Sequence, residues 1–212
     1  MSDSATSPRQ RILSAANELF YHLGYHASSI SEIIAKADVA KATFYSHFSS
    51  KEALCIEYLE QQNQAELDLI RQAVSEAGGA FERYMAPAVL MEAYSANSEL
   101  RGCRFINMAA EVPAVDSVLR KPGLDHYERL RTYLGELVRD LKESDPQAYT
   151  HIHVAAVTDT YLLLIGGGLA MAELFNELWP ARHIAYAVEM LARPAYSITD
   201  AVNELKAVNP NK

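Results

Sequence analysis

Residues 28–54 constrain the fold more than any other stretch, because they encode two short helices joined by a tight turn. A first helix can begin at Ser29, since Ser29 and Glu32 have the spacing of a capping box. In that motif the hydroxyl and the carboxylate each satisfy a free backbone N–H group. Three isoleucines that follow with helical spacing give this helix one apolar face. Asp38 then tolerates the left-handed backbone of a turn.

A second helix is predicted from about Lys41 to His47. Val39, Phe44 and Phe48 are expected to face inward from it. Its outward face is expected to carry Lys41, Thr43, Tyr45 and His47. Two short helices joined in this way form a helix-turn-helix, the second helix of which fits the major groove of DNA.

The segment GYHASSISEIIAKADVAKATFYSHFSSKEAL resembles the DNA-binding signature of the tetracycline-repressor (TetR) family. The resemblance is specific because many positions agree at fixed spacing. The matching residues are Gly24, Tyr25, Ser28, Ser29, Ile33, Ala37, Val39, Lys41, Thr43, Tyr45, His47, Phe48, Lys51, Glu52 and Leu54. Four positions depart from the family pattern. Ile34 stands where the family usually has alanine, and Asp38 where it has glycine. Ala40 replaces a serine or threonine, and Ala42 replaces a glycine. The last two alter the groove-facing surface, so the operator sequence cannot be carried over.

The resemblance implies an all-α fold. An N-terminal three-helix helix-turn-helix domain would be joined by a long helix to a larger helical domain for ligand binding and dimerisation. The pattern agrees, since an amphipathic stripe starts at Arg9 and a long helix capped by Ser49 or Ser50 reaches about Glu76. The expected division is a disordered arm at 1–8, a DNA-binding domain at 9–54, a helical domain at 55–196 and a tail at 197–212.

Beyond Gly79 every long segment is typical of a helix, and no segment alternates strictly enough to predict a sheet. Prolines mostly mark the starts and ends of these segments. The predicted helices cover about 80–96, 103–111, 118–142, 146–175 and 180–192.

Two residues near the start of the second helix, Lys41 and Thr43, could reach base edges. Lysine commonly pairs with guanine and threonine with the methyl group of thymine, which suits Lys41 and Thr43. Ala42 offers only close approach or methyl contact. The alternative is an ordinary solvated helix face.

Phosphate contacts are implied by the resemblance alone. It assigns them to Tyr45, His47 and Lys51. It also implies that Ser28 or Ser29 places a helix N-terminus against the DNA backbone.

The net charge of −8 argues against a nucleic-acid partner at first sight. Residues 1–55 hold equal numbers of acidic and basic side chains, so the excess acidity lies outside the DNA-binding part. Affinity should therefore depend on paired half-sites more than on bulk charge.

Asn107 and Glu111 lie four residues apart on an otherwise apolar short helix, and buried polar groups need partners. They either cap a neighbouring helix or line a ligand cavity. The other candidate lining residues are Tyr84, Met91, Tyr94, Tyr127 and Tyr161. Aromatic residues at helical spacing also suit a packed core, and the sequence does not choose between these uses.

The stretch 154–175 is apolar around most of its circumference, as expected of a bundle centre or a subunit interface. Its glycines at 166–168 suggest a break or the close approach of another helix. The resemblance implies that the last two long helices pair with their copies in a four-helix dimer interface, with a purely intramolecular core as the alternative. The candidate interface residues are Leu163, Gly167, Leu174, Ala187 and Met190.

The sequence gives no support for a disulfide-stabilised, metal-binding, phosphate-binding or catalytic protein. Cys55 and Cys103 form neither a disulfide framework nor a zinc motif, and His151 and His153 point in different directions on a helix. Phosphate-binding loops and nucleophile signatures are absent from the sequence. We therefore expect no enzyme activity, no catalytic residues, no metal and no cofactor. Without a signal peptide or a stretch of about 18 uncharged apolar residues, we expect a cytoplasmic protein outside the membrane.

These observations predict a one-component transcriptional regulator, by default a repressor. It would bind a palindromic double-stranded DNA operator as a homodimer and be released by a small-molecule effector in the C-terminal helical domain. One alternative is a small-molecule-binding helical protein or enzyme with a vestigial helix-turn-helix. Another is an accessory DNA binder without an inducer.

Overall fold

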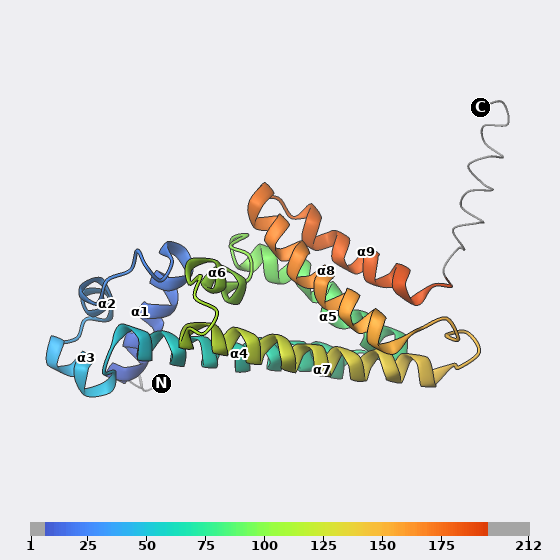
Figure 1. The fold of residues 1–212 in the computed structure, drawn as a ribbon, viewed down its shortest axis with the longest axis horizontal. Helices are drawn as coiled ribbons and strands as arrows, with labels where there is room; N and C mark the ends of the chain where they lie inside the picture. Colours follow the sequence, from blue (N-terminus) through green and yellow to red (C-terminus); the bar gives the residue numbers. More distant parts are fainter. Residues whose placement is uncertain (1–6, 195–212) are drawn as a thin grey trace, which may run out of the picture.

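The computed structural model describes residues 7–194, and every regular element in that range is helical (Figure 1). The predicted all-α fold is confirmed. The elements are α1 (Pro8–Leu23), α2 (Ile30–Ala37), α3 (Lys41–His47), α4 (Lys51–Glu76), α5 (Ala80–Asn97), α6 (Arg104–Glu111), the 3₁₀ turn η1 (Val118–Arg120), α7 (Lys121–Ser144), α8 (Val154–Phe175) and α9 (Trp179–Ala192).

The start of α1 corrects the predicted boundary of the N-terminal arm. Ser7 caps this helix, since its hydroxyl accepts a hydrogen bond from the backbone N–H of Gln10 at 3.2 Å, and Pro8 occupies the first turn. The helix therefore begins inside the segment 1–8 that was predicted to be disordered. The rest of that arm and the predicted tail lie outside the described residues.

The turn between α2 and α3 forms as its residue types predict. Ser29 and Glu32 make both hydrogen bonds of the capping box. Asp38 adopts the left-handed conformation with φ of 50°. The local sequence thus fixes both ends of α2 and the direction in which α3 leaves it.

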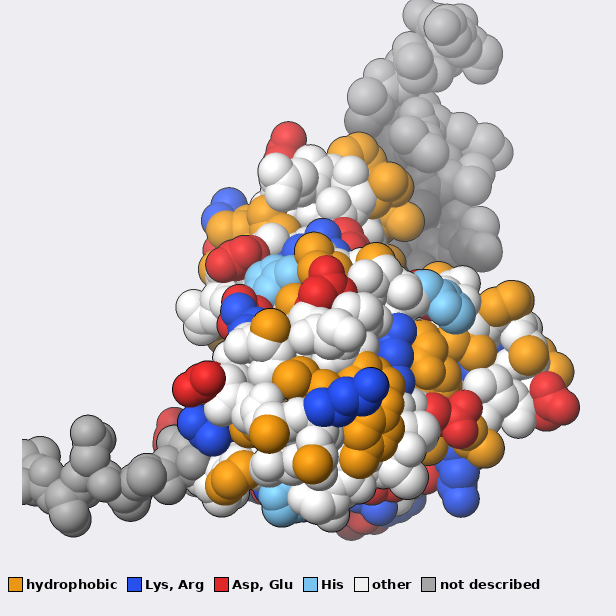
Figure 2. All heavy atoms as spheres, turned by 90° about the vertical axis from the view of Figure 1, so that its left-hand side faces the viewer, with side chains coloured by type: hydrophobic (Ala, Val, Ile, Leu, Met, Phe, Trp, Pro, Cys, Tyr) orange, Lys and Arg blue, Asp and Glu red, His pale blue; other side chains and the backbone are white. Residues whose placement is uncertain are grey.

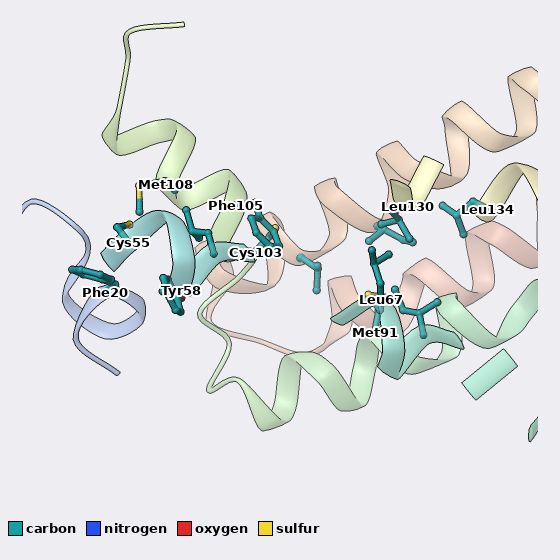
Figure 3. Packing of buried hydrophobic residues seen from close by; sticks show 14 of the residues in the cluster. Phe20, Cys55, Tyr58, Leu67, Met91, Cys103, Phe105, Met108, Leu130 and Leu134 are labelled. Atoms are coloured by element: carbon teal, nitrogen blue, oxygen red, sulfur yellow. The ribbon is translucent and has the colours of Figure 1, made fainter. Parts of the chain in front are cut away.

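A continuous core joins the N-terminal helices to the rest of the chain (Figure 3). The rings of Phe20 on α1 and Tyr58 on α4 lie 5.8 Å apart, and Met108 of α6 is buried beside them. Ser50 caps α4 through a 3.0 Å hydrogen bond from the N–H of Ala53, and the helix then runs on without a linker. Helix α1 of the N-terminal part thus packs directly on α4, which continues into the rest of the chain.

The larger part of the molecule is built on two long helices. Figure 1 shows α4 and α7 running along its length, with α8 and α9 paired above them. Helix α8 packs on α7, and α9 packs on α5. One predicted element is wrong: the helix expected from Pro146 begins only at Val154. The Asp145 carboxylate accepts hydrogen bonds from the backbone N–H groups of Gln147 and Ala148 and closes a local turn before it.

Helix α8 continues through its three glycines. A Cβ added at Gly168 would lie 2.4 Å from Ile184 of α9, so glycine permits the close approach of these two helices. By length and composition alone α8 is long and apolar enough to cross a membrane, although Asp159 and Glu173 lie within it. A helix of this composition is equally typical of a soluble core, and α8 packs against α5, α7 and α9.

Candidate functional site

The exposed face of α3 is held by the aromatic residues on its other side. Phe44 and Phe48 are buried, and their rings lie 6.1 Å apart. Lys41, Ala42, Tyr45 and His47 are exposed, whereas Thr43 is half-buried. Except for Thr43, the outward positions predicted from the sequence are therefore exposed to solvent.

The serines before α2 differ in their environment. Ser28 is 1% exposed and donates its hydroxyl to the carbonyl of Gly24 at 2.7 Å, so its side chain holds the loop before α2 instead of facing solvent. Ser29 is exposed and engaged in the capping box. Ser28 thus fixes the geometry of the loop, and Ser29 fixes the N-terminus of α2.

Lys51 lies at the first turn of α4, beside the same loop. Its ammonium group stands 4.2 Å from the centre of the Tyr25 ring, a cation–π arrangement. Partial burial lowers the pKa of this lysine. The contact orients the positive charge without neutralising it.

The charges around this end of the molecule are mixed. Figure 2 looks onto the end that carries α1–α3, and its Lys and Arg side chains are interspersed with acidic and apolar ones. Lys36 and Arg9 are paired with Glu18 and Glu57. Within residues 7–194, Lys41 makes no ion pair, so its charge is available to an external partner.

A small cavity of about 30 Å³ lies between α4, α5, α7 and α8. Three of the predicted ligand-binding residues, Met91, Tyr94 and Tyr127, line it. The remaining lining residues are Glu66, Leu69, Ile70, Leu90, Cys103, His126, Leu130, Ile165 and Leu169.

Tyr84 and Tyr161 are not brought to this cavity. The Tyr161 hydroxyl accepts a hydrogen bond from the N–H of Ala88 and donates one to the carbonyl of Tyr84, both at 2.9 Å. It thereby repairs the helix ladder of α5 beside Pro87, which interrupts that ladder. The Tyr84 hydroxyl donates to the carbonyl of Val188 on α9 at 2.8 Å. Both side chains are structural.

Asn107 and Glu111 also lie away from the cavity lining. The Asn107 amide donates to the carbonyl of Arg101 at 2.9 Å and to the Glu173 carboxylate at 3.2 Å. The Glu111 carboxylate accepts the backbone N–H groups of Tyr25 and His26 at 3.0 and 2.9 Å. Glu111 therefore clamps the loop that leads into α2.

A polar cluster that the sequence analysis missed connects the cavity to α1. The Arg104 guanidinium donates to Glu66 at 2.8 Å, to the Tyr58 hydroxyl at 3.0 Å and to the Asn17 side chain at 3.2 Å. It also lies 4.5 Å from the centre of the Tyr21 ring. One sequence feature could have revealed this cluster: two polar residues, Asn63 and Glu66, interrupt the apolar stripe of α4.

Burial dominates the ionisation of this cluster. It raises the pKa of Glu66, and the opposing effects of Arg104 and Tyr94 only partly offset it. Burial together with the nearby charge of Arg104 lowers the pKa of His126 to about 4. His126 is therefore neutral at pH 7, with Nδ1 3.0 Å from the Asn63 Oδ1 atom.

The predicted interface residues belong to an exposed apolar face of α8 and α9. Leu163 and Leu174 are 74% and 72% exposed, Met190 is exposed and Ala187 is half-buried. A Cβ added at Gly167 would meet nothing within 4 Å. Other exposed apolar residues of these two helices are Met171, Phe175, Trp179 and Tyr186.

The part of the chain from 7 to 194 contains no group of three or more His, Cys, Asp or Glu side chains placed to hold a metal ion. Cys55 and Cys103 are both buried and free. Burial raises the pKa of the Cys55 thiol to about 12 and also raises that of Cys103. Neither thiol is therefore poised as a nucleophile.

Residues 12–58 match the family model described as "Bacterial regulatory proteins, tetR family". The HTH-type transcriptional regulator UidR of Escherichia coli (strain K12) is 33% identical over 90 residues, which are 42% of this chain and 45% of that protein. The chain thus matches less than half the length of that relative. LmrA of Bacillus subtilis (strain 168), also an HTH-type transcriptional regulator, is 25% identical over 87% of this chain and 96% of its own.

Solved structures extend the similarity to the larger domain. SCO4454, a TetR-family transcriptional regulator from Streptomyces coelicolor, superposes with a TM-score of 0.77 at 25% identity. That match covers 87% of this chain and 94% of SCO4454. The reduced form of E. coli NemR has a TM-score of 0.75 at 19% identity over 87% of this chain and 97% of its own, a likeness in fold.

Proposed function

Because this chain belongs to the TetR family of transcriptional regulators, with a helix-turn-helix DNA-binding domain, we propose that it acts as a one-component repressor. In this proposal a homodimer binds a palindromic operator, and a small molecule in the helical domain releases it. No catalytic step is involved.

The observation that carries the proposal is the rigid mounting of an exposed polar helix face. Phe44 and Phe48 anchor α3 in the core, while Lys41 and Tyr45 point to solvent. Lys41 and Thr43 are the proposed base contacts, and Tyr45, His47 and Lys51 the proposed phosphate contacts. The N-terminus of α2, capped by Ser29, would face a phosphate.

Dimerisation is supported by the exposed apolar face of α8 and α9. Monomeric proteins rarely leave several large apolar side chains of adjacent helices in water, and a second copy of the same face would cover them. Two recognition helices in such a dimer must lie about 34–36 Å apart, or a multiple of that distance, to enter successive turns of the groove.

Release by an effector is supported by the contacts between the helical domain and the DNA-binding domain. Glu111 holds the loop before α2, and Arg104 joins Glu66 at the cavity to Asn17 on α1. A ligand that shifts these groups favours a different separation of the recognition helices. It releases DNA to the extent that it binds the released state more tightly.

The proposal is tested by selecting binding sites from a random-sequence DNA library with the purified full-length protein. The expected product is an inverted repeat whose half-site centres are separated by whole helical turns. A library that shows no enrichment, from protein that is folded by circular dichroism, would contradict operator binding. Enrichment of a single unrepeated half-site would contradict the dimeric mode alone.

A further inference from the structure

The buried carboxylate of Glu66 has one oxygen fully engaged and one directed toward the cavity. Its Oε1 atom accepts hydrogen bonds from Arg104 at 2.8 Å and from the Tyr94 hydroxyl at 2.9 Å. Its Oε2 atom makes no hydrogen bond within the described part of the chain. It stands 3.8 Å from Nε2 of His126, which is too far for a direct bond.

His126 presents a second acceptor to the same space. The Asn63 Oδ1 atom, 3.0 Å away, takes the proton of Nδ1. We assign this tautomer from the hydrogen-bond partner. Because the imidazole is neutral at pH 7, its Nε2 atom then keeps a free lone pair. Two acceptors therefore converge at the cavity without a donor from residues 7–194.

The space around these acceptors decides the size of the group that fits. The cavity of about 30 Å³ has room for one small group but not for a whole molecule. A groove of about 380 Å³ adjoins it, and Leu69, Leu90 and Tyr94 line both spaces. The far wall of the groove includes Asn17 and Tyr21 of α1.

Charge and hydrogen-bond capacity then select the chemistry. Arg104 already balances the charge of Glu66, so an added ammonium group would leave a buried net positive charge. A hydroxyl group carries one proton and satisfies one of the two acceptors. A neutral NH₂ group carries two protons and satisfies both.

We propose that this cavity binds the NH₂ group of an aromatic primary amine, which donates hydrogen bonds to Glu66 and His126. The aromatic ring of the ligand extends past Leu69 and Leu90 into the groove. The proposal rests on the ligand-binding part of the proposed function and names its ligand class. Because the groove that would receive the ring is also lined by Asn17 and Tyr21 of α1, the ligand would lie between the helical domain and the DNA-binding domain.

The test compares aniline with phenol, toluene and benzylamine by titration calorimetry on the full-length protein. These probes have similar size and differ in the number of donated protons and in charge. Aniline should bind about tenfold more tightly than toluene, with phenol between them and benzylamine weaker than aniline. Equal affinities for aniline and toluene would overturn the assignment, as would tightest binding by phenol or benzylamine.

Variants locate the binding. Glu66→Gln and His126→Phe should each remove most of the preference for aniline over toluene, whereas the matched variant Glu60→Gln, on the exposed side of α4, should retain it. His126→Phe leaves the ion pair between Arg104 and Glu66 intact, so it remains informative if Glu66→Gln does not fold. A preference retained in His126→Phe would overturn the proposed site.

DNA binding separates this proposal from the one on which it rests. Aniline that binds with the expected preference and leaves the affinity for the selected DNA unchanged would support the site and contradict release by its occupant. Protein that binds DNA but does not prefer aniline would contradict the ligand class and leave the DNA-binding function standing.

Discussion

The Glu111 carboxylate on α6 accepts the backbone N–H of Tyr25 at 3.0 Å, and so ties the helical domain to the loop that leads into α2. Its second oxygen accepts the N–H of His26 at 2.9 Å. A Cβ at Gly24, where φ is 90°, would approach Glu111 to 2.7 Å. The loop is thus shaped to receive this side chain.

Replacing Glu111 should test how strongly the two domains are joined. Glu111→Ala leaves two backbone donors without their acceptor, and we expect the free energy of unfolding to fall by about 1–3 kcal/mol. Urea denaturation followed by circular dichroism measures this change. Asp116→Ala, at an exposed position of the following loop, is the control. Equal stabilities for the two variants would show that the clamp contributes nothing.

Two adjacent glycines of α8 should behave in opposite ways. Gly167→Arg should leave the protomer folded, because nothing lies within 4 Å of the added Cβ, and should disrupt a dimer formed through this face. Gly168→Ala should instead destabilise the fold, because its Cβ would meet Ile184 at 2.4 Å. Sedimentation velocity and thermal unfolding separate the two effects. A Gly167→Arg protein that remains a dimer would move the interface elsewhere.

The lowered pKa of His126 should make stability depend on pH. The folded value is about 4, and the unfolded value is near 6.5, so between them only the unfolded chain binds the proton. The free energy of unfolding should therefore decrease as pH falls through this window. The raised pKa of Glu66 acts in the opposite sense, since its folded form takes up a proton more readily.

Comparison with His126→Phe isolates the histidine, because Glu66 is present in both proteins. Between pH 7 and pH 5 the parent protein should lose about 2 kcal/mol of stability relative to the variant. Urea denaturation at both pH values measures the difference. Parallel losses in the two proteins would mean that His126 titrates normally.

The sequence predicted the elements whose signals are local. The capping box of Ser29, the left-handed turn at Asp38 and the stripe of α1 each depend on neighbouring residues, and each formed. The family resemblance supplied the arrangement of the two domains. Beyond α4 the helices were also recognised, except where the turn after Asp145 delays the start of α8.

The side-chain partners could not be predicted, because they depend on packing between helices far apart in the chain. Tyr161 is an aromatic residue of a type common in ligand-binding sites, yet its hydroxyl bridges the backbone hydrogen bonds of α5 that Pro87 interrupts. Glu66 and Arg104 lie on separate helices, and only the tertiary fold brings them together at the cavity. Ser28 matched the family pattern, but its local hydrogen bond turns it inward.

The base-contact assignment predicts a loss of discrimination when the start of α3 is truncated. Lys41→Ala combined with Thr43→Ala should reduce the ratio of operator to random-DNA affinity by about tenfold or more, because each base contact contributes roughly 1–3 kcal/mol. Lys121→Ala, an exposed lysine at the start of α7, is the matched control. A double variant that discriminates as well as the parent would remove Lys41 and Thr43 from the base-reading surface.

Specific DNA recognition is the central claim, and fluorescence anisotropy on the DNA that flanks the protein's own gene tests it most directly. Measured at several salt concentrations against random DNA, the account predicts tight binding to the flanking DNA and weaker, more salt-sensitive binding to the random sequence. No binding to either DNA at low salt, from folded protein, would contradict it.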